Sequence, residues 1–491
     1  MLVALSACFP EPTALPPGGP EEAGTPEPLE QDTTPTPELP TSTPLPTRPV
    51  YSPGELVDYT AQTGDTLPLL ALRFNTAVEE ILEANPFIPR TASTMPPGMP
   101  MKIPIYYAPF WGTSYQILPD SLFINGPAQV GFNTSEFIAQ QPGWLKEHVE
   151  WAADSNRSAG QIIDLVARNY SVSPRLLLAL VEYQSGALSN PDPSPAERVY
   201  PAGNRSRERV GLYRQLIWVA NTLNNHYYTY RAGRLLTIEH DDGREERFDP
   251  WQNAATVALQ VFFHQLMDKE TWTKAIGPDG FAQTYTRLFG DPWEVEPHLA
   301  GSLEQPPLLL PFEPGDVWAL TGGPHTGWGL GEPLSALDFA PPSVRQGCVE
   351  SAVWATAVAD GVVVRSEYGE VMLDLDGDGD ERTGWNIYYL HVATEGRVPL
   401  GAALKAGDRI GHPSCEGGSS TGTHIHMARK YNGEWMMAEG IAGGHLAYNL
   451  EGWIAHNGRA VYQGSLVRMG NEVISCTCSN AASFIRTDRA P

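Results

Sequence analysis

Two histidines separated by a single residue lie in the run Thr421-Gly-Thr-His-Ile-His426. Because side chains alternate across a β-strand, a strand here projects both imidazoles from the same face, into one groove. Such a pair is weak evidence by itself, since surface histidines often pair by accident. Its context strengthens it, because His325 and Asp338 lie upstream and His391 ends another expected strand. Imidazoles and carboxylates are the side chains that transfer protons and ligate metals in active sites.

A second cluster of potential ligands is the acidic run from Asp374 to Asp380, between two expected strands. Its carboxylates offer oxygen ligands to a calcium ion, and the run matches the start of an EF-hand loop. The match ends at Trp385, which occupies the position of the bidentate glutamate. Two interpretations stay open: an acidic, glycine-rich hairpin turn, or a Ca²⁺ site formed by Asp374, Asp376, Asp378 and Asp380.

The segments around these side chains predict antiparallel β-structure. Apolar residues alternate over 357–365, 370–374 and 385–391, and glycine- and aspartate-rich turns bound these runs. We therefore expect a mostly antiparallel β-domain over 310–470, followed by an unassigned C-terminal tail over 471–491.

Within this β-domain, four motifs follow one another. They are Ala359-Asp-Gly-Val-Val-Val, Tyr389-Leu-His391, Lys405-Ala-Gly-Asp-Arg-Ile-Gly411 and Gly418-Ser-Ser-Thr-Gly-Thr-His-Ile-His426. In this order they resemble the M23 family of zinc peptidases, the LytM and lysostaphin-like enzymes that cut peptide crosslinks in bacterial peptidoglycan.

The resemblance implies a zinc site and its catalytic groups. His325, Asp338 and His426 would be the Zn²⁺ ligands, leaving a fourth tetrahedral position for water, as in other catalytic zinc sites. The zinc would lower the pKa of that water and polarise the scissile carbonyl. His391 and His424 would act as general base and as stabilisers of the oxyanion.

One departure from the family lies between the first two ligands. The spacing from His325 to Asp338 is longer than the family usually has, and Gly327-Trp-Gly-Leu-Gly331 fits an inserted loop. Such a loop could leave both ligands in place, reshape the substrate groove, or displace His325. His412 is the obvious substitute ligand in the last case.

The start of the chain resembles a bacterial lipoprotein processing site. In Leu5-Ser-Ala-Cys8, small residues precede a cysteine that would carry the lipid anchor, so 1–8 is interpreted as a partial signal peptide and lipobox. A chance cysteine is the alternative. Residues 9–55 are rich in proline, threonine and glutamate and predict a disordered, extended stalk between the membrane and the folded domains.

Residues 56–106 predict a small strand–helix–helix–strand unit, in which Thr66 caps the first helix. Tyr59-Thr60, Gly64-Asp65-Thr66 and the second helix resemble a LysM domain, a family that binds N-acetylglucosamine polymers in a shallow groove. The resemblance implies that Gly64, Asp65, Thr66 and Asn85 border this glycan-binding groove. The alternative is a spacer with a degraded groove.

Residues 110–305 show apolar periods of 3.6 and predict an all-helical domain. Leu176–Gly186 and Asp249–Asn253 are similar to lysozyme-like lytic transglycosylases. Gln184 occupies the position of the catalytic glutamate there, and an amide cannot act as a general acid. Glu182, two positions earlier on a helix, should face elsewhere. We therefore expect a glycan-holding or spacing domain that cleaves no sugar chain.

Length and composition limit the fold class and the partners. A chain of 491 residues with 42% hydrophobic residues predicts several folded domains, and the helical and β patterns above make it a multidomain α+β protein. Its net charge of −25 argues against nucleic acid as a partner. No apolar run is long enough to span a bilayer. The four remaining cysteines are compatible with disulfides or with free thiols; they are Cys348, Cys415, Cys476 and Cys478.

These observations predict an extracytoplasmic zinc endopeptidase, lipid-anchored or secreted, which the LysM unit directs to the cell wall. Its partners would be the glycan and peptide stems of peptidoglycan, and the membrane through the anchor. The alternative is a non-catalytic, wall-binding LytM-like regulator of other hydrolases. Because every metal and catalytic position is filled, the sequence favours the enzyme. A glycosidase that uses the helical domain is disfavoured by Gln184.

Overall fold

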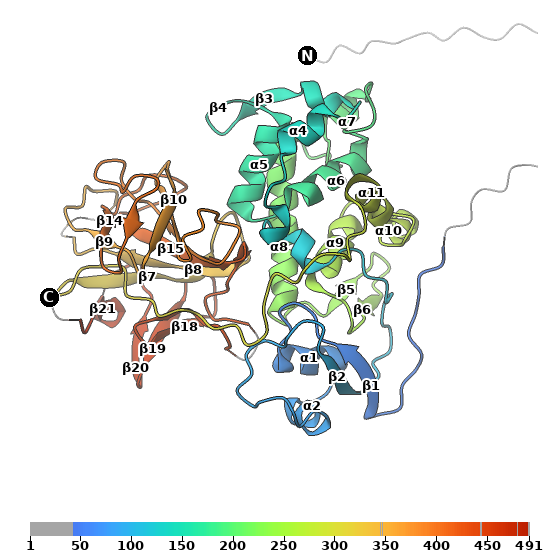
Figure 1. The fold of residues 1–491 in the computed structure, drawn as a ribbon, viewed down its shortest axis with the longest axis horizontal. Helices are drawn as coiled ribbons and strands as arrows, with labels where there is room; N and C mark the ends of the chain where they lie inside the picture. The colour runs from blue at the N-terminus through green and yellow to red at the C-terminus, as the bar shows by residue number, and fades with distance from the viewer. Residues whose placement is uncertain (1–42, 344, 346, 442–443, 479, 490–491) are drawn as a thin grey trace, which may run out of the picture. The chain divides into compact units, whose positions relative to one another are not determined.

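A computed structural model describes residues 43–489, with gaps at residues 344, 346, 442–443 and 479 (Figure 1). Cys8 and most of the expected stalk lie outside the described residues. The end of that segment, residues 43–54, has no helix or strand and lies along the helical domain. Arg48 Nε donates to Asp249 Oδ2 at 3.0 Å, and the guanidinium lies 4.0 Å above the Trp251 ring.

The LysM region has the expected element order. Thr66 caps α1, where its side chain accepts from the Leu69 amide, and the two strands pair antiparallel. Their side chains and those of α1 enclose a core that includes Tyr59, Phe74 and Ile103. The elements are β1 (Glu55–Thr60), α1 (Leu67–Phe74), α2 (Val78–Ala84) and β2 (Pro100–Ile105).

The middle domain is helical around α9 (Ala254–His264), which is buried from Ala254 to Phe263 because it is apolar on every face. α8 (Leu212–Arg231) packs against it. The other helices are α3 (Asp120–Phe123), α4 (Thr134–Ala139), α5 (Ala159–Tyr170), α6 (Pro174–Ser185), α7 (Pro195–Val199), α10 (Lys269–Ala275) and α11 (Phe281–Phe289). Short 3₁₀ turns lie at Pro127–Gln129, Trp144–Glu147 and Arg207–Arg209.

Two short hairpins depart from the expected all-helical domain. They are β3 (Val149–Ala152) with β4 (Ser155–Ser158), and β5 (Thr237–Glu239) with β6 (Glu245–Arg247). Both are mostly polar or exposed, so no apolar period marks them in the sequence.

The C-terminal domain is built on a nine-stranded sheet in which every described pair is antiparallel, as expected (Figure 1). The strand order is β13-β10-β11-β12-β15-β8-β7-β21, and β16 also pairs with β15. The strands are β7 (Val317–Thr326), β8 (Leu334–Ala340), β10 (Gly361–Glu367), β11 (Glu370–Asp374), β12 (Trp385–Leu390), β13 (Ala403–Leu404), β15 (Ile425–Tyr431), β16 (Glu434–Trp435) and β21 (Phe484–Arg486).

Two smaller sheets accompany it. One has four strands, β17 (Asn449–Leu450), β18 (Trp453–Asn457), β19 (Gly464–Arg468) and β20 (Asn471–Ile474). The other pairs β9 (Ala355–Thr356) with β14 (Arg409–Gly411).

The described part of the expected tail 471–491, residues 471–478 and 480–489, belongs to this domain. It supplies β20, the 3₁₀ turn Ala481–Ser483 and the edge strand β21, and Ile485 of β21 is buried in the same core as the sheet. The strands are too short and too polar to produce a visible apolar period.

Four cysteines of the domain form two disulfides, Cys348–Cys415 and Cys476–Cys478. Among the described residues, no helix combines the length and the apolar character that a membrane span requires.

Candidate active site

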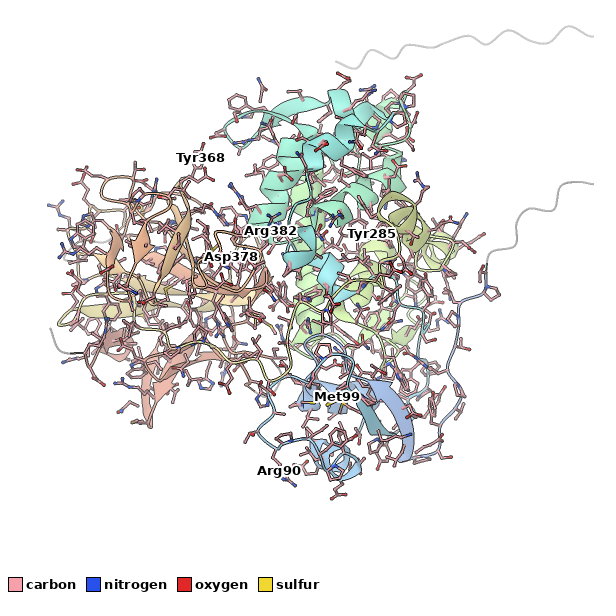
Figure 2. The ribbon with its side chains drawn as sticks, in the orientation of Figure 1. Arg90, Met99, Tyr285, Tyr368, Asp378 and Arg382 are labelled. Carbon is pink, nitrogen blue, oxygen red and sulfur yellow. A yellow bond between two sulfur atoms is a disulfide. The ribbon has the colours of Figure 1, made fainter. Side chains whose placement is uncertain are left out.

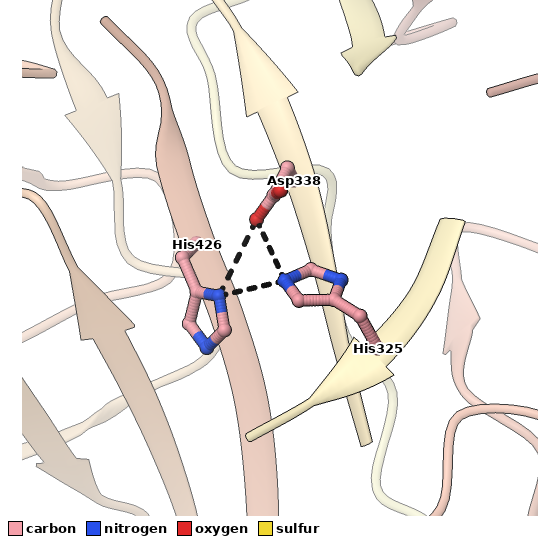
Figure 3. Close-up of side chains that lie close together, drawn as sticks. All are labelled: His325, Asp338 and His426. Carbon is pink, nitrogen blue, oxygen red and sulfur yellow. Dashed lines mark hydrogen bonds and ion pairs between the residues drawn. The ribbon is translucent and has the colours of Figure 1, made fainter. Parts of the chain in front are cut away.

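Three side chains converge from three neighbouring strands of the large sheet (Figure 3). His426 on β15 is directly opposite Asp338 on β8, and His325 reaches the same point from β7, the next strand. Gly322 of β7 is also opposite Asp338, and a Cβ at Gly322 would collide with the carboxylate. A glycine is therefore needed where β7 passes the carboxylate.

The three ligating atoms form a tight triangle. His325 Nε2 lies 2.9 Å from His426 Nδ1 and 3.2 Å from Asp338 Oδ1, and His426 Nδ1 lies 3.3 Å from that same oxygen. All three side chains are buried. Ligands of a tetrahedral zinc ion, with bonds of about 2.0–2.1 Å, lie about 3.3 Å from one another. The triangle is therefore the size that such an ion needs.

Backbone carbonyl groups orient both ligand imidazoles. His325 Nδ1 donates to the Gly323 carbonyl at 2.8 Å, and His426 Nε2 donates to the Gly327 carbonyl at 3.1 Å. Because a carbonyl oxygen can only accept, these bonds place the ring proton on the outer nitrogen. In the neutral rings, the inner nitrogens then carry lone pairs that face each other.

This arrangement fits a divalent cation. Asp338 Oδ1 is buried without a hydrogen-bond partner, next to two imidazole lone pairs. A buried polar atom without a partner lowers the stability of the folded protein. A bound cation would accept a lone pair from each of the three ligand atoms. Two nitrogens and one oxygen are ligands that zinc accepts.

The charges within the site shift the pKa values in opposite directions. Burial raises the pKa of Asp338, but the nearby His325 and His424 outweigh it and hold that pKa well below its usual range. Burial lowers the pKa of His325, yet the Asp338 carboxylate raises it overall. Burial dominates at His426 and lowers its pKa. The carboxylate is therefore charged at neutral pH, as a metal ligand must be.

Two further imidazoles border the triangle. The His391 and His424 rings lie 4.5 Å apart, and His424 Nε2 is 3.5 Å from Asp338 Oδ1. His391 Nδ1 donates to the Glu416 carbonyl at 2.9 Å, and His424 Nδ1 donates to the Gly422 carbonyl at 2.7 Å. Nε2 is thus the atom of each ring that is left for chemistry. Burial lowers the pKa of His391 to about 4, so this ring is neutral at pH 7.

The structure thus brings together all five residues to which the family resemblance assigns the metal and catalytic roles. His391 has a left-handed backbone, with a φ of 68°, which is unusual for a residue other than glycine. Such a conformation persists only where the surrounding structure enforces it, and it is concentrated at functional sites.

Tyr462 is a neighbour of the site that the sequence does not indicate. Its ring stacks on His325 with a centroid distance of 4.2 Å, and its carbonyl accepts from the Gly323 amide. The ring is half exposed. Tyr462 lies in a loop before β19 that carries no recognisable motif, so only the fold places it beside a ligand.

The extra residues between His325 and Asp338 form a loop between β7 and β8, and both ligands remain at the site. α8 holds this loop: the Leu330 amide donates to Asn221 Oδ1 at 2.9 Å, and the Glu332 amide donates to Asn225 Oδ1 at 2.7 Å. The loop begins at Gly327, whose carbonyl orients His426. His412, the possible substitute ligand, instead lies against Trp354 with a centroid distance of 3.8 Å.

The acidic run after β11 gathers three of its four carboxylates. Asp374, Asp376 and Asp378 each offer an oxygen within 4.8 Å of the others. Asp380 instead pairs with Arg382 at 2.5 Å; Asp378 and Arg382 are labelled in Figure 2. Burial and the neighbouring Asp376 raise the pKa of Asp374 to about 6. A calcium site at these residues stays a prediction.

Three of the four residues expected to border the LysM groove, Asp65, Thr66 and Asn85, have partners within the protein. Asp65 accepts from Tyr59 Oη at 2.6 Å and from Arg73 at 2.9 Å, while Asn85 bonds to the backbone of Lys102. Asp65, Thr66 and Asn85 are all buried. Their hydrogen bonds and burial give them a structural role, and their glycan contacts stay a prediction.

The turn at Gly64 is also covered by another part of the chain. Arg231 Nη1 donates to the Thr63 carbonyl at 2.6 Å, and a Cβ at Gly64 would collide with this guanidinium. On the neighbouring loop, Thr94 Oγ1 donates to the Ala300 carbonyl at 2.9 Å. Both loops of the LysM unit therefore contact residues from outside that unit, Arg231 and Ala300.

Glu182 in the helical domain has a structural environment. Its carboxylate accepts from the Leu188 amide at 2.8 Å and pairs with Arg287 at 2.9 Å, so it holds the turn after α6. These hydrogen bonds lower its pKa although burial raises it. A general acid needs the opposite shift. The shift therefore argues against Glu182 as a general acid, and the absence of sugar-chain cleavage by this domain stays a prediction.

Two known protein families match the helical region and the LysM region of the chain separately. A family model described as LasA, N-terminal domain, matches residues 116–303, and a model of the LysM domain matches residues 59–104. The helical region is therefore similar to the N-terminal domain of LasA. Its expected lysozyme-like character stays a prediction.

Two curated relatives are also similar to the chain. The chain is 28% identical to Protease LasA of Pseudomonas aeruginosa (strain UCBPP-PA14) over 355 residues, which cover 68% of this chain and 78% of the relative. It is 30% identical to the beta-lytic metalloendopeptidase of Lysobacter enzymogenes over 140 residues, which cover 27% of this chain and 74% of the relative.

Among solved structures, the M23 metalloprotease pseudoalterin from the deep sea aligns at 23% identity with a TM-score of 0.30. The alignment covers 35% of this chain and 96% of that protein.

Proposed function

Because the chain belongs to the beta-lytic metalloendopeptidase family, we propose that it is an M23-type zinc endopeptidase that hydrolyses peptide crosslinks of bacterial peptidoglycan. One observation carries the proposal: His325, Asp338 and His426 converge on a single point, and two further imidazoles border it.

In this proposal the three converging side chains hold Zn²⁺. The ion, when bound, supplies Lewis-acid chemistry that activates water and polarises the scissile carbonyl. Asp338 is ionised, and the carbonyl groups behind both ligand rings hold the ring proton on the outer nitrogen, so the carboxylate and the two inner nitrogens face the proposed ion.

His391 and His424 transfer protons in this proposal. Each ring holds its Nδ1 proton on a carbonyl group, so Nε2 is the atom that takes a proton from the attacking water. The low pKa of His391 keeps this atom free at neutral pH. Once protonated, the same nitrogen donates to the developing oxyanion or to the departing amine.

We propose further that the protein works at the cell wall, where the LysM domain would bind glycan. The LysM match and the likeness to LasA support this location. Lipid attachment at Cys8 is a separate part of the proposal. Metabolic labelling with a fatty-acid analogue in a bacterial host tests it: label should be incorporated by the wild type and not by Cys8→Ser.

Digestion of purified peptidoglycan tests the enzymatic proposal. The full chain should bind one zinc ion and release peptides with new amino termini, detected by mass spectrometry. Asp338→Ala, which removes a ligand, serves as the inactive control. Zinc binding without cleavage would indicate a wall-binding regulator, and new reducing sugar ends would indicate a glycosidase instead.

A further inference from the structure

The two histidines that do not ligate the metal depend on segments outside the large sheet. His391 follows the last residue of β12, and its left-handed backbone is fixed by the segment 414–416. The Ser414 amide donates to the His391 carbonyl at 2.7 Å, while the Glu416 carbonyl accepts the His391 ring proton at 2.9 Å. This segment therefore sets both the backbone and the ring of His391.

His424 is bonded to the same segment, since its amide donates to the Ser414 carbonyl at 3.3 Å, and it also depends on a second segment. Thr423, the residue before it, donates its amide to the Gly347 carbonyl at 3.1 Å. The Thr423 hydroxyl donates to the Val349 carbonyl at 2.6 Å and accepts from the Val349 amide at 2.8 Å. Residues 347–349 thus hold the chain next to His424, just before β15 begins.

The disulfide Cys348–Cys415 joins the centres of these two segments. Cys415 lies between Ser414 and Glu416, which contact His391, and Cys348 lies between Gly347 and Val349, which hold Thr423. The ligands His325, Asp338 and His426 are placed by ladder pairs of β7, β8 and β15 instead. One covalent bond therefore joins the segments that contact His391 and His424. The metal ligands are positioned by strand pairing instead.

We propose that Cys348 and Cys415 are positioning residues for His391 and His424, and that reduction of their disulfide lowers turnover while zinc stays bound. The proposal rests on the peptidase function given above. Reduction by a dithiol breaks the S–S bond, takes up two electrons and two protons, forms two thiols and oxidises the dithiol to its own disulfide. The two histidines are then linked by the hydrogen bonds of Ser414 without the covalent bridge, and their rings are held less rigidly.

The test compares Cys348→Ser/Cys415→Ser with wild type in the full chain. The variant should bind one zinc ion with a dissociation constant within about threefold of wild type, and its kcat should fall about tenfold or more. Cys476→Ser/Cys478→Ser is the matched control, because it removes the other described disulfide, whose sulfurs accept hydrogen bonds from the Asn480 side chain and the Cys478 amide. This control should retain the wild-type kcat.

All kinetic measurements are made at a temperature where circular dichroism shows that each variant is folded. If the folded variant has the wild-type kcat, the disulfide only stabilises the fold and the proposal is wrong. Loss of zinc from the folded variant would also overturn it, because the metal ligands would then depend on the bridge. An inactive wild type would instead contradict the peptidase function.

Hydrogen exchange tests the same proposal without activity. The amides of Ser414 and Thr423 should exchange faster in Cys348→Ser/Cys415→Ser, while amides of β8 and β15 that pair at Asp338 keep their protection. Unchanged protection of Ser414 and Thr423 would overturn the proposal even if no substrate were cleaved.

Discussion

At the scale of single residues, backbone carbonyl groups set the orientation of the site. Each of four imidazoles donates one ring proton to a carbonyl oxygen, and the other ring nitrogen of each remains for the metal or for proton transfer. The carbonyls belong to Gly323, Gly327, Glu416 and Gly422. Every residue has a backbone carbonyl group, so the sequence does not reveal which carbonyl groups orient the imidazoles. Only the three-dimensional structure does.

Asp338 is the only carboxylate in the ligand triangle. Asp338→Asn keeps the shape of the side chain but removes the charge, so zinc affinity should fall about a hundredfold or more and peptidase activity should be lost. Competition titration with a chelator measures the affinity. Asp380→Asn is the control, since Asp380 lies in the other acidic cluster and pairs with Arg382. An unchanged zinc affinity in Asp338→Asn would contradict the ligand assignment.

Lys430 provides a test of pH dependence away from the metal ligands. Burial lowers the pKa of Lys430 to about 8 although Glu381 lies 3.6 Å away. Protonating the Lys430 amine thus costs more free energy in the folded chain than in the unfolded chain. The free energy of unfolding should therefore rise as the pH increases from about 8 to 10.5. At pH 7 the folded protein carries the full penalty, which corresponds to about 3 kcal/mol.

Lys430→Met removes this penalty. The variant should exceed the wild type in free energy of unfolding by up to about 3 kcal/mol at pH 7, and the pH-dependent part of the difference should vanish near pH 10.5. Urea unfolding at both pH values measures it. A difference between the two proteins that does not change with pH would show that the ammonium is not penalised in the folded state.

At the scale of elements, the loop between β7 and β8 links the helical domain to the metal ligands. Gly329 and Gly331 have φ values of 86° and 87°, and both lie against α8. A Cβ at Gly329 would come within 2.5 Å of Asn221 Oδ1 and 2.6 Å of the Tyr170 ring. The glycines let the loop approach the helix closely, and its first residue then supplies the carbonyl that orients His426.

Gly331→Ala should displace this loop, because its Cβ would collide with the Asn225 amide group. Zinc affinity should fall about tenfold, since a ligand loses its orienting partner. Gly401→Ala is the matched control: Gly401 has a φ of 80°, but its Cβ would meet nothing within 4 Å. Both variants carry the same backbone strain of about 1 kcal/mol, so equal zinc affinities would contradict the role of the loop.

The sequence predicts the periodic elements and misses those without a period. Alternation over 357–365 and 385–391 anticipates β10 and β12, and the LysM order is found as expected. β21 is too short for a period, and it is fixed by pairing with β7, far away in the sequence. Motifs supply the five candidate site residues. Tyr462 lies in no motif, and only the fold brings it to His325.

At the scale of the whole described chain, one buried charge network joins three regions. Arg231 of α8 lies 3.1 Å from Glu434 of β16 and 3.4 Å from Asp120, and it donates to the Thr63 carbonyl of the LysM domain. His298 Nε2 lies 2.6 Å from Glu434. Burial raises the pKa of Glu434, but Arg231 outweighs it and the pKa falls below its usual value. The single guanidinium thus compensates carboxylates from different domains.

Arg231→Met should lower the free energy of unfolding by about 3–5 kcal/mol, because it leaves buried carboxylates without a cation. Urea denaturation measures the loss. Arg234→Met is the control, since Arg234 pairs with Glu332 near the surface, and it should cost less than about 1 kcal/mol. Arg231→Met/Glu434→Gln should recover part of the stability. If the double variant recovers none, the orphaned charge is not the cause.

The carbonyl-bound imidazoles have a consequence for the proposed uptake of zinc. Since hydrogen bonds to the backbone already choose the tautomer of both ligand rings, binding of the proposed ion would require no change of tautomer in either ring. The proposed enzyme would then lose activity when zinc is scarce and regain it when zinc returns.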